Sequence, residues 1–77
     1  MEYQMFIHEN SNNPGQFIGG IAPRDNGGGF FGGTPITGGS PEEVQKKLEE
    51  YFKSSNSYQP GDVLHDINGK LILRKGN

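Results

Sequence analysis

The chain has 77 residues and no cysteine, so it has the length of one small domain and lacks both disulfide bonds and thiolate chemistry. Its 7 basic and 9 acidic residues give a net charge of −2, without the basic excess that is typical of nucleic-acid-binding domains. No stretch approaches the roughly 20 apolar residues of a membrane span, and the first residues do not resemble a signal peptide. We therefore expect a cytoplasmic protein without a membrane or nucleic-acid partner.

The composition also predicts a weakly stable fold. Only 30% of the residues are apolar, and the 13 glycines lose much backbone entropy on folding. A monomer of this kind should be stable by only about a few kcal/mol. We expect a larger protein partner to contribute further stability, and a homodimer remains an alternative.

The chain begins with a pattern that predicts a β-hairpin. Residues 2–9 alternate and place three apolar side chains on one face: Tyr3, Met5 and Ile7. An asparagine-rich run with a proline and a glycine at 10–15 predicts a turn. A second strand over 16–22 should then pair with the first in the antiparallel sense.

A third strand is expected after a glycine-rich turn. The turn covers residues 23–29, and the strand covers residues 30–37. Pro35 should interrupt this strand or place it at a sheet edge, because proline has no N–H to donate to a neighbouring strand.

The strongest local signal predicts a helix over about 41–53. Ser40 is a good N-cap, Pro41 suits the first helical position, and Glu43 completes a capping box. Apolar residues follow at i, i+4, i+7 and i+8, which predicts one buried stripe: Val44, Leu48, Tyr51 and Phe52. The polar remainder includes an expected i,i+4 ion pair between Glu49 and Lys53.

The last part of the chain predicts a second hairpin. Its strands should cover 63–66 and 70–74, and Asn68-Gly69 between them favours a type I′ turn. The complete order is β-β-β-α-β-β. We therefore predict a single α+β domain over residues 1–77, with one helix packed on an antiparallel sheet.

Phe30 and Phe31 are candidate partner-binding residues. Consecutive residues of a strand point to opposite faces, so only one of the two rings can enter the core beneath the helix. The other ring, flanked by glycines, would suit a protein edge, a peptide or a sugar. The alternatives are that both rings are buried in the core or that a dimer covers the second one.

Four glutamates of the helix form a second candidate surface: Glu42, Glu43, Glu49 and Glu50. They could imitate phosphate groups toward a basic groove of a partner. The alternative is an ordinary solvated outer face of an amphipathic helix.

Catalytic and metal sites are not predicted. A metal or acid–base site would need the first and fourth strands to be neighbours, so that His8 could approach His65 and Asp66. His65 and Asp66 are adjacent on one strand and therefore point to opposite faces of the sheet, so both cannot easily reach one ion. We therefore expect them to be surface polar residues, with no cofactor. The glycine run at 27–39 contains no phosphate-loop lysine, so a permissive loop is expected there.

Residues 2–52 resemble the N-terminal half of HicB-type antitoxins. The resemblance lies in residues 3–9 (Tyr-Gln-Met-Phe-Ile-His-Glu), in residues 16–21 (Gln-Phe-Ile-Gly-Gly-Ile), and in the helix start at 40–44 (Ser-Pro-Glu-Glu-Val). It implies a hairpin followed by a capped helix, and a function through a protein partner. The family's segment of the Pro-x-Leu-x-Gly-Cys kind before the helix is absent. The end of the chain, from residue 63 to 71, is similar to an uncharacterised family of small bacterial proteins, which implies no function.

These patterns together predict a small, non-enzymatic protein-binding module that occludes a site on a larger protein. Cysteine-free, acidic, glycine-rich domains of this length are common among inhibitors from phages and mobile elements, such as anti-CRISPR proteins. One alternative is a small-ligand or carbohydrate-binding domain that uses the glycine and phenylalanine loop. Another is a HicB-like antitoxin or regulator.

Overall fold

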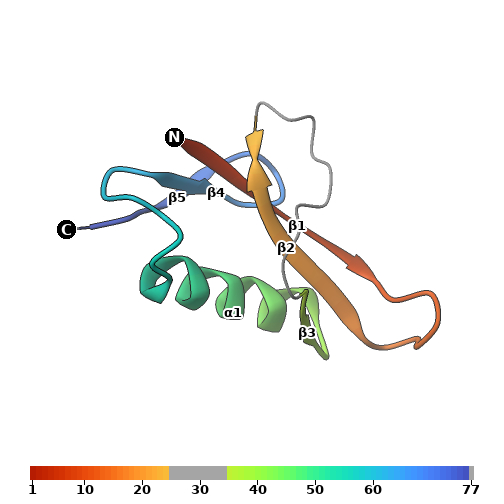
Figure 1. Cartoon of the computed structure of the whole chain (residues 1–77). Helices are drawn as coiled ribbons and strands as arrows, with labels where there is room; N and C mark the ends of the chain where they lie inside the picture. Colours follow the sequence, from red (N-terminus) through yellow and green to blue (C-terminus); the bar gives the residue numbers. More distant parts are fainter. Residues whose placement is uncertain (25–34, 77) are drawn as a thin grey trace.

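The computed structural model describes residues 1–24 and 35–76 and shows a five-stranded sheet with a helix packed against one face (Figure 1). The elements follow in the order β1 (Glu2–Glu9), β2 (Phe17–Pro23), β3 (Ile36–Gly38), α1 (Pro41–Ser54), β4 (Val63–His65) and β5 (Leu71–Arg74). The predicted α+β class and the predicted order β-β-β-α-β-β are confirmed. Of the predicted third strand, residues 30–34 lie outside the described residues.

The sheet has the strand order β3-β2-β1-β4-β5 and is mixed, not wholly antiparallel as the sequence had suggested. The exception is the pair of β1 and β4, which run parallel with Tyr3 opposite Leu64. The reason is the connection through α1, which returns the chain along the sheet before β4 begins. Strand β2 is antiparallel to both β1 and β3, so β3 runs parallel to β1. The helix then carries the chain back, and β4 runs parallel to β3 and β1, as is usual for two strands joined by a helical crossover.

Helix α1 begins as its sequence predicts. The Ser40 hydroxyl accepts a hydrogen bond from the Glu43 N–H at 3.1 Å, and Pro41 occupies the first turn. The carboxylate of Glu43 reaches back to the N–H of Gly39 at 3.2 Å, one residue earlier than in a standard capping box. Both ends of the box are thus formed, with the second bond displaced by one residue.

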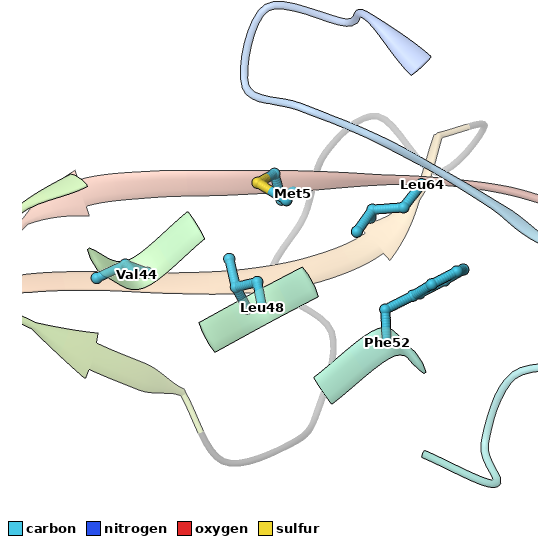
Figure 2. Packing of buried hydrophobic residues seen from close by; sticks show 5 residues of the cluster. All are labelled: Met5, Val44, Leu48, Phe52 and Leu64. Carbon is cyan, nitrogen blue, oxygen red and sulfur yellow. The ribbon is translucent and has the colours of Figure 1, made fainter. Parts of the chain in front are cut away.

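The core lies between α1 and the sheet. Five buried side chains meet there, as Figure 2 shows: Met5, Val44, Leu48, Phe52 and Leu64. Tyr51, predicted to share the buried stripe, is instead 47% exposed. The reason is that each i+4 step rotates the stripe by about 40°, so by Phe52 the core-facing side has turned away from Tyr51.

Gly19 of β2 provides the space in which α1 packs. A Cβ atom added at Gly19 would lie 2.5 Å from Cγ1 of Val44 and 3.0 Å from Cδ1 of Leu48. It would also lie 3.0 Å from the carbonyl oxygen of Phe6, which belongs to the backbone of the neighbouring strand and cannot rotate away. The close approach of the helix to β2 therefore requires glycine at this position.

We predict that Gly19→Ala lowers the free energy of unfolding by about 1–3 kcal/mol, because the methyl group overpacks a filled core. Gly76→Ala is the matched control, since a Cβ there meets nothing within 4 Å. Adding Val44→Ala to Gly19→Ala should cost less than the sum of the single changes. Urea titrations measure the wild type and the four variants (Gly19→Ala, Val44→Ala, their double variant and Gly76→Ala), and strictly additive losses would contradict the proposed clash.

An aromatic cluster closes the core at the end of α1. The Tyr58 ring lies 4.5 Å from that of Phe52 and 4.9 Å from that of Tyr3, measured between ring centroids. Burial among these rings raises the pKa of Tyr58 to about 12, with smaller contributions from the neighbouring Tyr51 and Tyr3 hydroxyls. The folded protein thus favours the neutral phenol more strongly than the unfolded chain does.

This raised pKa predicts a loss of stability in alkaline solution. The contribution of Tyr58 is complete below about pH 10, the pKa of an unfolded tyrosine, and is lost as the pH rises toward 12. Denaturant titrations from pH 8 to 12 should therefore show a shallower decline for Tyr58→Phe than for the wild type. Tyr51→Phe removes only a smaller contribution to the raised pKa of Tyr58, so its profile should stay closer to that of the wild type than the Tyr58→Phe profile does. Parallel curves for Tyr58→Phe and the wild type would refute the assignment.

Candidate functional site

The structure places only some of the residues that the sequence nominated. Phe30 and Phe31 lie outside the described residues, so the predicted glycine and phenylalanine surface has no described geometry. The four glutamates lie on the solvent side of α1, away from Val44, Leu48 and Phe52. Their neighbourhood can therefore be described, and it differs from a purely acidic patch.

Lysines share the outer face of α1 with the glutamates. The helix carries four glutamates and three lysines (Lys46, Lys47 and Lys53), which gives it a net charge of −1 (3 − 4). Glu43 pairs with Lys47 at 3.1 Å, and its pKa is lowered by hydrogen bonds from Lys47 and from the N–H of Gly39. Glu49 accepts a hydrogen bond from Gln45 at 3.2 Å, and the described ion pair of the helix is Glu43–Lys47 instead of the expected Glu49–Lys53.

The two histidines lie on neighbouring strands but far apart along them. His65 of β4 stands opposite Gln4, whereas His8 stands at the other end of β1, opposite Ile18. His65 is only 5% exposed, so its prediction as a surface residue is wrong. Its Nδ1 lies 3.0 Å from the Tyr3 carbonyl oxygen and its Nε2 lies 3.4 Å from the Glu2 carboxylate. The ring thereby links β4 to β1.

No metal centre is formed by residues 1–24 and 35–76, since no three histidine or acidic side chains gather there. Within the same residues, no helix is long and apolar enough to cross a membrane.

The turn of the last hairpin is built by Asp66. Its carbonyl accepts from the Gly69 N–H at 2.9 Å, and its carboxylate accepts from the N–H groups of Asn68 and Lys70, each at 2.9 Å. Gly69 has a φ of +86°, whereas Asn68 has a negative φ, so the predicted type I′ turn is wrong. A three-residue loop with a left-handed glycine forms instead, because the Asp66 carboxylate stabilises the N–H groups of that arrangement.

This turn presents a group of side chains that we call the hairpin surface: Ile67, Lys70, Leu71 and Arg74. All four are exposed, and Ile67 and Leu71 are 45% and 50% exposed. A bulge in β5 places Ile72 and Leu73 together against the core, so these two bury their side chains while Leu71 does not.

Three residues of the hairpin surface, Leu71, Arg74 and Ile67, lie on the sheet face opposite α1. Leu71 is in register with His65, which is in register with Gln4, and these positions alternate with the core-facing residues. Ile67 borders a groove of about 390 Å³ on the same face, together with Gln4, Phe6 and Arg24. The Arg24 guanidinium lies 3.3 Å from the Glu2 carboxylate at the rim of this groove. The groove therefore suits the binding of a partner segment that combines apolar side chains with negative charge.

Sequence reasoning did not predict the exposure of Ile67 and Leu71. The available signal was the position of Ile67, since a large aliphatic residue inside a polar turn rarely finds a core to enter. The exposure of Leu71 depends on the bulge in β5, which the sequence pattern does not reveal.

Comparisons of the chain with protein-family models, with curated proteins and with solved structures found no match. The resemblance to HicB-type antitoxins therefore gains no support from them, and it stays a prediction.

Lys75 anchors the hairpin to the end of α1. Its ammonium group donates to the carbonyls of Phe52, Lys53 and Ser55 at 3.1, 2.7 and 2.6 Å. Its backbone N–H donates to the Asp62 carbonyl at 2.8 Å. A positive charge on the last carbonyls of a helix interacts favourably with the helix dipole. The hairpin is consequently held at both ends, by this anchor and by the Asp66 turn.

We expect Lys75→Met to lower the free energy of unfolding by about 1–2 kcal/mol, because two carbonyls of α1 and that of its C-cap Ser55 lose a charged donor. Lys70→Met is the control, since Lys70 is an exposed lysine of the same hairpin and should change stability by less than about 0.5 kcal/mol. Thermal and urea denaturation measure both variants. Equal stability of the two would show that the anchor contributes nothing.

Proposed function

We propose that this chain is a small, non-enzymatic protein-binding module that acts by occluding a site on a larger protein, which it contacts with the hairpin surface. The observation that carries the proposal is the exposure of Ile67 and Leu71 on one face of a hairpin that also carries the exposed cations Lys70 and Arg74. Protein interfaces combine apolar anchors with a charged rim in this way.

The scarcity of apolar residues strengthens this argument. Burying an isoleucine or leucine side chain fully is worth about 1.5–3 kcal/mol. A chain with 30% apolar residues, whose described part (residues 1–24 and 35–76) has a core cluster of five buried side chains, has few such contributions available. The solvent exposure of two large aliphatic side chains, Ile67 and Leu71, on an anchored hairpin is therefore better explained by a partner that buries them.

The helix glutamates offer a second proposed contact, as an imitation of phosphates. The lysines of the helix partly neutralise the negative charge of this face. The glutamates and the hairpin surface also belong to opposite faces of the sheet, so a single flat partner surface would meet only one of them. Inhibition of a larger protein, of the kind that phages and mobile elements use, is compatible with either face.

The test is an affinity capture from the host lysate with the full-length tagged protein, quantified by mass spectrometry. Three chains are compared: the wild type, the double variant Ile67→Ser/Leu71→Ser, and the double variant Glu49→Lys/Glu50→Lys. We expect one dominant partner protein, captured at least about tenfold less by the hairpin variant, which corresponds to about 1.4 kcal/mol. The helix variant should retain the partner.

Circular dichroism and thermal melting establish that all three chains are folded. Loss of the partner with the helix variant alone would move the binding site to the glutamates. Folded wild-type protein that captures no partner would overturn the proposed function.

A further inference from the structure

We infer that the outer edge of β5 takes up an extended, acidic segment of the partner as an added strand of the sheet. This inference rests on the proposed function and gives it a binding mode. It starts from the strand order, which places β5 at one edge of the sheet. An edge strand offers N–H and C=O groups to an extended chain, a common way of binding a peptide.

The hydrogen bonds around Arg74 show which backbone groups are offered. Arg74 is opposite Val63, whose N–H donates to the Met1 carbonyl at 3.0 Å and is therefore directed to the β1 side. The next residue, Lys75, directs both its N–H and its C=O inward, to Asp62 and Gly61. Since successive residues of a strand alternate, the N–H and C=O of Arg74 point outward.

The edge is also held in place before any partner binds. The Lys75 ammonium fixes its end on three carbonyls of α1 and the following residue, and the Asp66 turn fixes its beginning. A binding edge that is already ordered loses little conformational entropy on association, which favours binding.

The charge of the hairpin determines the chemistry of the added strand. Lys70 and Arg74 are exposed at the two ends of the edge. The hairpin's acidic groups are engaged internally: the Asp62 carboxylate binds the Met1 ammonium and the Gln59 N–H, and Asp66 binds its own turn. An acidic segment would therefore place its carboxylates beside Lys70 and Arg74, since opposite charges on neighbouring strands stabilise a sheet.

Two other arrangements are less favourable. A second copy paired through the same edge would bring two sets of Lys70 and Arg74 together, and like charges on neighbouring strands are destabilising. The opposite sheet edge, β3, is only three residues long, and the Lys47 ammonium already binds the Thr37 carbonyl at 2.8 Å. The edge of β5 is thus the better acceptor for a strand.

The test uses the full chain and two synthetic peptides with blocked ends, Glu-Val-Glu-Val-Glu-Val-Glu and the same peptide with lysine in place of glutamate. Titrations followed by ¹H–¹⁵N spectra should show shifts concentrated on β5, and amide exchange at Arg74 should slow on binding. We expect the Kd for the lysine peptide to be at least about tenfold weaker.

Two variants at one position separate the backbone from the charge. Arg74→Thr removes the charge and keeps the outward N–H, whereas Arg74→Pro removes both. The proline spares the bonds to β4, because the Arg74 N–H makes none of them. Strand addition predicts that Arg74→Pro weakens binding clearly more than Arg74→Thr does. Equal binding by the two variants, or unchanged exchange at the Arg74 amide of the wild type, would overturn it.

The outcomes also separate this inference from the proposed function. If Arg74→Pro still captures the lysate partner and Ile67→Ser/Leu71→Ser does not, the result supports the proposed protein-binding function and contradicts strand addition at β5. If the wild type sediments as a concentration-dependent dimer with a protected Arg74 amide, the occupant of the edge is a second copy and the acidic segment is overturned.

Discussion

The close contact between α1 and Gly19 is the constraint on which the remaining architecture depends. A helix that carries Val44 and Leu48 can lie this low on β2 only where the strand has no side chain. That position brings Leu48 and Phe52 over β1 and β4, where Met5 and Leu64 complete the core. It also directs the chain after α1 to the far side of β1, where β4 must enter in the parallel sense. Ile67, Leu71 and Arg74 then follow on the sheet face opposite α1.

The last hairpin combines an exposed outer side with hydrogen bonds that tie it to the rest of the fold. Three Lys75 bonds and the Asp66 turn order a segment whose outer side is in water. Surfaces of this kind can recognise a partner without a large ordering cost. The helix, by contrast, carries charges of both signs that already engage one another, as Glu43 and Lys47 do.

The helix and the first hairpin could be predicted because their signals are local. Ser40, Pro41 and the buried spacing of Val44, Leu48 and Phe52 act within one turn or two. The parallel pairing of β1 with β4 could not be predicted, since it depends on how the helix crosses the sheet. The burial of His65 follows from that pairing and was missed with it.

The candidate site was less predictable than the fold. The Asn68-Gly69 pair suggested a type I′ turn, but the Asp66 carboxylate stabilises a different loop through side-chain hydrogen bonds that a dipeptide rule ignores. That loop and the bulge in β5 decide which aliphatic side chains face water. Both are tertiary or side-chain effects, whereas the sequence pattern reports only that these residues are apolar.

The central place of β1 has a consequence for how the chain acquires its structure. Its partners are β2, which follows closely, and β4, which begins some 60 residues later in the chain. Until β4 is made, one edge of β1 stays open beside an incomplete core. Pairings between such distant segments slow folding and expose strand edges that can aggregate. We therefore expect folding to be completed only when the last hairpin is available, so the segment that presents the proposed binding surface also closes the sheet.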